Sequence, residues 1–136
     1  MASSLRVFIG GAGTAAAWTE LTADAGPAVR MQARDLQHAQ RASRRLRADT
    51  DAAVVLDLEV LIAEDRRSAR RLLSAVSPAR DNVHYVGTVE GLVGLLADIE
   101  SAGVADGVTL IPVAPEQDAR ALAERTLSRL RLKRAG

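Results

Sequence analysis

The feature that most constrains this chain is a repeated alternation of short apolar runs with longer segments of helical periodicity. Residues 5–9, 28–31, 52–63 and 108–111 are rich in aliphatic and β-branched side chains, which predicts strands. Each run precedes a segment whose apolar residues recur at helical spacing. A strand followed by a helix, repeated, is typical of parallel strands joined by right-handed crossovers. The sequence therefore predicts an α/β protein built from four parallel βα units.

The helical segments complete this pattern. They cover residues 14–24, 35–47, 64–76, the stretch between Thr88 and Gly103, and residues 116–132. Residues 79–86 carry no clear pattern and stay unassigned. Because no linker-like or low-complexity stretch divides the chain, a single domain over residues 1–136 is expected.

The segment 86–113 contains the clearest unit. Thr88 can cap a helix with its hydroxyl, and Glu90 places negative charge in the first turn, where the helix dipole favours it. Gly103 predicts the end of that helix. The following strand is short, since Pro112 bars its continuation. This segment thus predicts a capped helix, a tight turn and one buried strand.

The composition excludes several classes of protein. The chain has 136 residues, a net charge of +1 and no cysteine, which excludes disulfides and thiolate metal sites. No window approaches the roughly 20 apolar residues that a membrane span needs. The near-neutral charge gives no reason to expect a nucleic acid or membrane partner. We therefore expect a cytoplasmic protein without a metal site.

Two motifs resemble a known family. Residues 86–92 read VGTVEGL and residues 102–112 read AGVADGVTLIP. They are similar to the V-G-T-x-E-x-[VL] and A-G-x-D-G-[VF]-x-L-x-P motifs of luciferase-like flavin monooxygenases, with one residue inserted in the second. Over nearly its whole length the chain resembles the C-terminal half of that family, which includes bacterial luciferase and deazaflavin-dependent oxidoreductases. The resemblance implies half of a (β/α)8 TIM barrel.

The candidate cofactor-binding residues are Gly10, Gly11, Ala12, Gly13 and Thr14, which follow the first predicted strand. Glycine-rich backbone at a helix N-terminus suits a phosphate. The resemblance implies that this loop contacts the phosphate of FMN or of the deazaflavin F420. The family pattern A-G-x-S is altered here, since Ala12 stands where glycine is usual and Thr14 replaces serine. A plain strand-to-helix turn with a capping threonine is the alternative.

A half-barrel leaves two terminal strands with unpaired backbone, and the sequence predicts an apolar inner face. We therefore expect a homo-oligomer or a complex with a separately encoded N-terminal half-barrel. The resemblance implies a flavin-dependent monooxygenase or oxidoreductase that is active only in a completed site, with catalytic residues that the sequence does not identify. One alternative is a non-catalytic half-barrel that acts in assembly or ligand binding. Another is a small doubly wound domain that binds a different phosphorylated ligand.

Four further residues carry titratable chemistry. Asp57 and Glu59 share one side of a predicted strand, because side chains alternate along it. Such a pair can share a proton in acid–base catalysis, but pairing with arginine across strands is the favoured interpretation. His38 and His84 have no readable partner, and their spacing predicts no metal site.

Eight arginines form two basic helix faces: Arg41, Arg44, Arg45, Arg47, Arg66, Arg67, Arg70 and Arg71. Nucleic-acid binding would favour interleaved aromatic residues or a recognised module, and the sequence has neither. We therefore expect these faces to be solvated.

Overall fold

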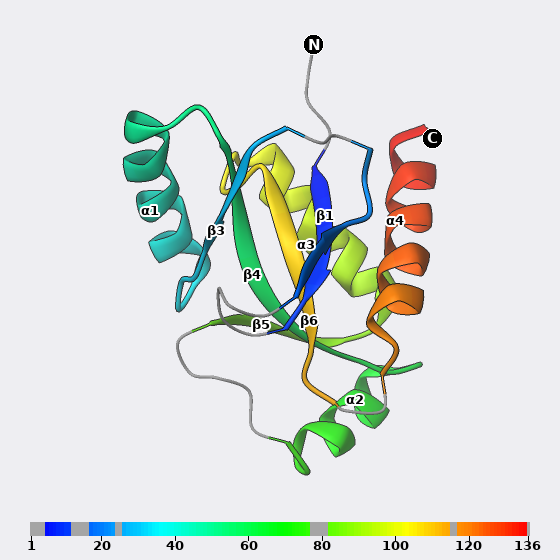
Figure 1. Ribbon diagram of the computed structural model, residues 1–136. Helices are drawn as coiled ribbons and strands as arrows, with labels where there is room; N and C mark the ends of the chain where they lie inside the picture. Colours follow the sequence, from blue (N-terminus) through cyan, green and yellow to red (C-terminus); the bar gives the residue numbers. More distant parts are fainter. Residues whose placement is uncertain (1–4, 12–16, 24–25, 77–81, 115–116, 136) are drawn as a thin grey trace.

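The computed structural model describes residues 5–11, 17–23, 26–76, 82–114 and 117–135. Within these ranges the chain forms one six-stranded mixed sheet that curls into a half-barrel, with four helices (Figure 1). The strands are Arg6–Gly10 (β1), Trp18–Glu20 (β2), Ala28–Met31 (β3), Ala53–Ile62 (β4), Val83–Gly87 (β5) and Gly107–Pro112 (β6). The helices are Leu36–Asp49 (α1), Arg66–Leu73 (α2), Val89–Ser101 (α3) and Ala119–Ala135 (α4).

Strand β4 organises the sheet. The hydrogen-bonded order is β2-β1-β6-β4-β3, and β5 also pairs with β4. Along one edge β4 pairs with β3 through residues 53–56 and with β5 through residues 58–62. Its other edge pairs with β6 through residues 55–60. These three pairings of β4 are parallel, as is the pairing of β1 with β6. Only the pairing of β1 with β2 is antiparallel among the described strands.

The four predicted strands all form, and the pairings among them are parallel. Their order in the sheet differs from the order along the chain that a half-barrel predicts. Strand β1 pairs with β6, the last strand, and not with β3. An isolated half-barrel leaves the outer edge of its last strand without a backbone partner. Here the first strand of the same chain covers that edge.

Two sequence expectations are corrected. The helix predicted over residues 14–24 is wrong over its described residues 17–23, because residues 18–20 form β2, which returns antiparallel along β1; the rest of that prediction lies outside the described residues. Trp18 and Thr19 are strand-favouring residues, and tertiary pairing prevails over a weak helical pattern. The unassigned residues 79–86 contain most of β5, where Val83, Tyr85 and Val86 are also strand-favouring.

The predicted helix ends are confirmed where capping residues mark them. The Thr88 side chain accepts a hydrogen bond from the Gly91 N–H at the start of α3. Gly103, just after α3, has a φ of 66°, a left-handed conformation that favours glycine. Asp35 and Asp65 cap α1 and α2 in the same way as Thr88.

The core lies between the helices and the outer face of the sheet. Every second residue of β4, including Val54, Leu56, Leu58 and Val60, faces this core. The intervening residues point to the inner face and are buried as well, so β4 is covered on both sides. This explains its nearly continuous apolar sequence. Within the described residues, no helix is both long and apolar enough to cross a membrane.

Candidate functional site

The inner face of the curled sheet holds the most chemically varied residues of the chain. It is not the apolar surface that the sequence predicts: Asp57 and Glu59 of β4 and Thr109 of β6 are buried there. Phe8 of β1 and Trp18 of β2 lie on the same face. Because β4 alternates with a period of two, placing Val54, Leu56, Leu58 and Val60 in the helix-side core turns Asp57 and Glu59 inward.

A buried ion pair crosses this face from β3 to β4. The Nε and Nη2 atoms of Arg30 donate to Oδ1 and Oδ2 of Asp57 over 3.0 and 3.1 Å. The two side chains are only 5% and 1% exposed. Two parallel charge-assisted bonds of this kind fix orientation as well as charge. The expected cross-strand pairing is therefore confirmed for Asp57, and Glu59 lies buried two residues further along.

An aromatic stack covers the centre of the inner face. The Phe8 and Trp18 rings lie with centroids 4.5 Å apart and an interplanar angle of 14°. The Trp18 indole N–H donates to the Thr109 hydroxyl over 2.8 Å. The Arg30 guanidinium lies 5.6 Å from the Trp18 ring centroid. The short strand β2 thus places its tryptophan over residues from three neighbouring strands.

Two arginine side chains form hydrogen bonds between the β1–β2 side and the β3 side of the sheet. Arg6 of β1 forms an ion pair with Glu20 of β2 at 2.6 Å, and it also donates to the carbonyl oxygen of Gly26, just before β3, over 2.9 Å. Arg30 of β3 donates to the carbonyl oxygen of Gly11, just after β1, over 2.8 Å. Side chains thereby connect strands β1 and β3, which share no backbone pairing.

The described residues of the predicted phosphate-binding loop, Gly10 and Gly11, form part of the β1–β2 hairpin. Gly10 pairs with Trp18, and the Gly11 N–H donates to the Ala17 carbonyl oxygen over 3.3 Å. A Cβ atom at Gly10 would lie 2.6 Å from the same oxygen, which accounts for the glycine without a ligand. Residues 12–14 of the prediction lie outside the described residues.

Gly10 and Gly11 thus have a structural role in the hairpin, and their contact with a flavin phosphate stays a prediction. The Gly11 N–H donates to a carbonyl oxygen of the hairpin, and the predicted helix N-terminus at Thr14 lies outside the described residues. The role of Ala12, Gly13 and Thr14 in binding FMN or F420 stays a prediction.

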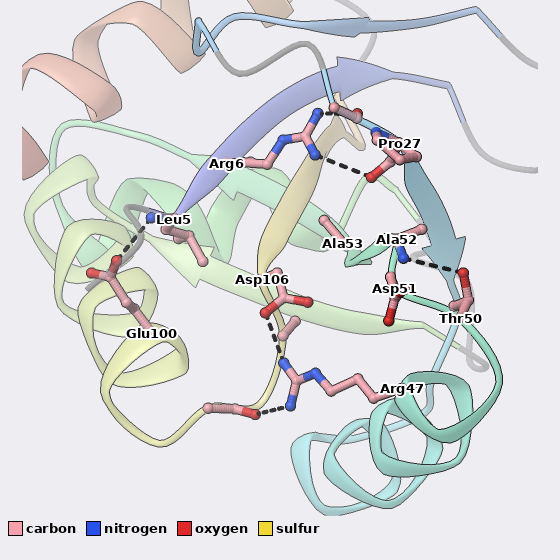
Figure 2. A pocket seen from close by; sticks show the side chains of 13 residues that line it. Leu5, Arg6, Pro27, Arg47, Thr50, Asp51, Ala52, Ala53, Glu100 and Asp106 are labelled. Carbon is pink, nitrogen blue, oxygen red and sulfur yellow. Dashed lines mark hydrogen bonds and ion pairs between the residues drawn. The ribbon is translucent and has the colours of Figure 1, made fainter. Parts of the chain in front are cut away.

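A cavity of about 580 Å³ opens at the amino-terminal edge of the parallel strands (Figure 2). The charged side chains that line this cavity form hydrogen bonds with backbone groups around it. Arg47 bridges Asp106 at 2.9 Å and the Gly103 carbonyl oxygen at 3.1 Å. The second Asp106 oxygen accepts from the Val54 N–H, and Glu100 accepts from the Leu5 N–H. Barrel and doubly wound enzymes use the carboxyl edge of the strands. We therefore interpret this cavity as structural.

The two histidines lie in different places: His38 is on α1, and His84 of β5 is beside Glu59 of β4, its register partner, on the same side of the sheet. His38 Nδ1 accepts from the Arg34 N–H over 3.2 Å, while the His38 N–H donates to Asp35 at the start of α1. That backbone hydrogen bond is the main reason why the pKa of Asp35 is lowered. His84 is exposed on β5. Among the described residues, no three histidine or acidic side chains gather closely enough to hold a metal ion.

Sequence reasoning did not identify Arg6, Phe8, Trp18 and Arg30 as members of one cluster. The signal available for each was slight, since a single aromatic or arginine in a short strand has many explanations. Comparison with known proteins adds no further assignment: the chain matches no protein-family model and no curated protein.

Proposed function

We propose that this chain is a non-catalytic half-barrel that acts through ligand binding or assembly. The observation that carries this proposal is that the polar side chains described on the inner face are engaged with one another. The interior of a barrel enzyme is a packed core, and its catalytic groups lie at the carboxyl ends of the strands. Here Trp18, Arg30 and Asp57 fill the interior and are paired with one another or with neighbouring strands.

Catalysis on this face would require some of these groups to leave their partners. Breaking a buried ion pair by removing one member costs about 3–5 kcal/mol. A substrate would have to compensate for that cost before any chemistry began. The geometry therefore favours a structural role for Arg30 and Asp57.

The proposed assembly rests on strand edges. Strands β2, β3 and β5 each pair with one other strand, so each has a second edge without a strand partner among the described residues. Exposed strand edges are templates for pairing with another chain. The expected occupants are a second copy of this chain or a separately encoded N-terminal half-barrel.

A flavin-related role is the second candidate function, and one observation favours it. The segment that carries both luciferase-like motifs folds as β5, the Thr88-capped helix α3 and the parallel strand β6. Strands joined by a capped helix also occur in TIM barrels, although here β4 lies between β5 and β6. In this role the chain would bind FMN or F420 near Gly10–Thr14 as a subunit of an oxidoreductase or monooxygenase. The complement would then have to supply most of the flavin-ring pocket.

One set of measurements separates the two functions. FMN and F420 are titrated separately against the chain, with Trp18 fluorescence and the melting temperature as readouts. We expect no shift with either cofactor, together with a dimer or larger species at micromolar concentration by light scattering. A saturable shift that Thr14→Ala weakens would favour the flavin role. A monodisperse monomer with a cooperative melt would contradict assembly.

A further inference from the structure

A groove of about 560 Å³ lies along helix α4, where the chain leaves β2. Its apolar part is lined by Leu21, which directly follows β2, and by Leu127 and Leu132 of α4. Four polar residues of the same helix complete the lining: Arg120, Glu124, Ser128 and Arg131. Figure 1 shows α4 along the side of the molecule opposite α1. We call this hollow the α4 groove.

The α4 groove combines an apolar centre with charged margins. Leu127 is 7% exposed, whereas Leu132 is 69% exposed, more than any other large apolar side chain among the described residues. Apolar surface therefore extends from the core to solvent. Glu124 and Arg131 are both exposed beside it. This is the arrangement of a protein interface, in which polar residues surround an apolar centre.

The charges of the groove are self-complementary. Glu124 and Arg131 are separated by about two helical turns and lie on the same side of α4. Leu127 and Ser128 lie midway between them. An antiparallel second copy centred at that point places Glu124 of one protomer opposite Arg131 of its partner, and two-fold symmetry repeats the contact. The small side chain of Ser128 lets the two helices approach closely at the centre.

Both charged groups are accessible to a partner. Glu124 is 62% exposed, and its pair with Arg120 at 3.8 Å leaves the carboxylate open to a second cation. An exposed pair of this kind contributes little stability, so a partner can compete with it. Arg131 is exposed and forms no ion pair with the described residues. The groove therefore offers one acidic and one basic group for contacts outside its own chain.

The other described helices lack this property. Helix α2 has no acidic residue and α3 has no basic residue, so two copies of either helix would meet like charges. Helix α1 has four arginines and a single acidic residue, Asp49, at its last position. A symmetric dimer uses the same surface on both copies. Among the described helices, α4 is therefore the one whose charges suit a second copy of itself.

We propose that the α4 groove binds the same groove of a second copy of this chain, which forms a two-fold dimer through antiparallel α4 helices. Each copy buries its Leu132 against the apolar part of the partner's groove, and two contacts between Glu124 and Arg131 flank the centre. Because Leu21 directly follows β2, the surface is continuous with the terminal strand of the sheet. This inference rests on the proposed assembly role and names its partner and its surface.

The test measures the dimer dissociation constant of the full chain by analytical ultracentrifugation. E124R places arginine opposite the partner's Arg131, and R131E places glutamate opposite the partner's Glu124. Each variant should raise Kd at least about tenfold, because two attractive contacts become two repulsive ones. The exchange variant E124R/R131E restores opposite charges, so its Kd should return to within about threefold of the unmodified value.

Two further measurements use the same surface. An equimolar mixture of E124R and R131E should form a heterodimer that is tighter than either homodimer, since both contacts then join arginine to glutamate. L132Q should raise Kd about tenfold through lost apolar burial. Because Leu132 is exposed in the single chain, L132Q should leave the helical circular dichroism signal unchanged.

A matched control reverses a charge on another side of the same helix. Arg125 is exposed and lines a different hollow, next to Ile62 at the end of β4. R125E changes the net charge as much as R131E does, but its Kd should stay that of the unmodified chain. An equal rise of Kd in R125E and R131E would assign the effect to overall charge and overturn the proposal.

The remaining outcomes separate this surface from the assembly role. A dimer whose Kd does not respond to E124R, R131E and L132Q would overturn the α4 interface and leave assembly through the strand edges. Failure of E124R/R131E to restore Kd would show that the two residues do not face each other. A monomer throughout the micromolar range would contradict both the interface and the assembly role.

Discussion

Removing either member of the buried Arg30–Asp57 pair should strongly destabilise the half-barrel. Arg30→Met leaves the Asp57 carboxylate, which is 1% exposed, without its two guanidinium donors. Hydrogen bonds to charged groups contribute about 1.5–3 kcal/mol each, so losing two costs about 3–6 kcal/mol, in line with about 3–5 kcal/mol for breaking a buried ion pair. Asp57→Leu should cost a similar amount because it removes the carboxylate that faces the buried Arg30 guanidinium.

The double variant R30M/D57L tests whether the two losses share one cause. It removes both charges and replaces them with apolar groups, which is often neutral in buried pairs. We expect its loss of unfolding free energy to be smaller than the sum of the single losses by at least about 2 kcal/mol. Urea unfolding measures all four proteins, and the single tryptophan of the chain, Trp18, reports on the same region by fluorescence.

An exposed ion pair provides the control. Arg120 and Glu124 lie 3.8 Å apart with side chains 57% and 62% exposed, so Arg120→Met should change stability by about 1 kcal/mol or less. The reasoning is refuted if Arg30→Met costs no more than this control, or if the losses at Arg30 and Asp57 simply add. Either result would mean that the two side chains do not form the buried pair described.

Three further predictions concern single features of the fold. Thr109→Val should lower the unfolding free energy by about 1–3 kcal/mol, because it leaves the Trp18 indole N–H without its acceptor; unchanged urea stability and tryptophan emission would contradict it. Gly103→Ala should cost about 1 kcal/mol in the same assay, since alanine disfavours a φ of 66°; a stabilising effect would count against the left-handed helix end. The pKa values of Asp35 and Asp65 are lowered by capping hydrogen bonds, so their contribution is present above the usual aspartate pKa and is lost as pH falls through the lowered values. The melting temperature of D35N/D65N should therefore approach that of the unmodified chain below about pH 4; a difference that stays constant with pH would refute this.

Local patterns in the sequence determined the elements whose signals are short-ranged. The β4 strand was readable because a long apolar run has few alternatives, and α3 because Thr88 and Gly103 mark its ends. Strand β2 was missed because Trp18–Glu20 contains only three residues, and its conformation depends on pairing with β1. Of the candidate site, the sequence predicted only that Asp57 pairs with an arginine across strands, because alternation along the strand places it on one side.

By itself the sequence determined an α/β chain of parallel strands with helices between them, since periodicity and capping act within a few residues. Only the tertiary structure decided that β1 covers the edge of β6, that Trp18 stacks on Phe8, and that Arg30 is the partner of Asp57. These contacts join residues far apart in the chain, and their free energy depends on burial and on which strand edges remain unpaired. No local pattern encodes burial or the pairing of strand edges, so both are decided only when the strands assemble into the curled sheet.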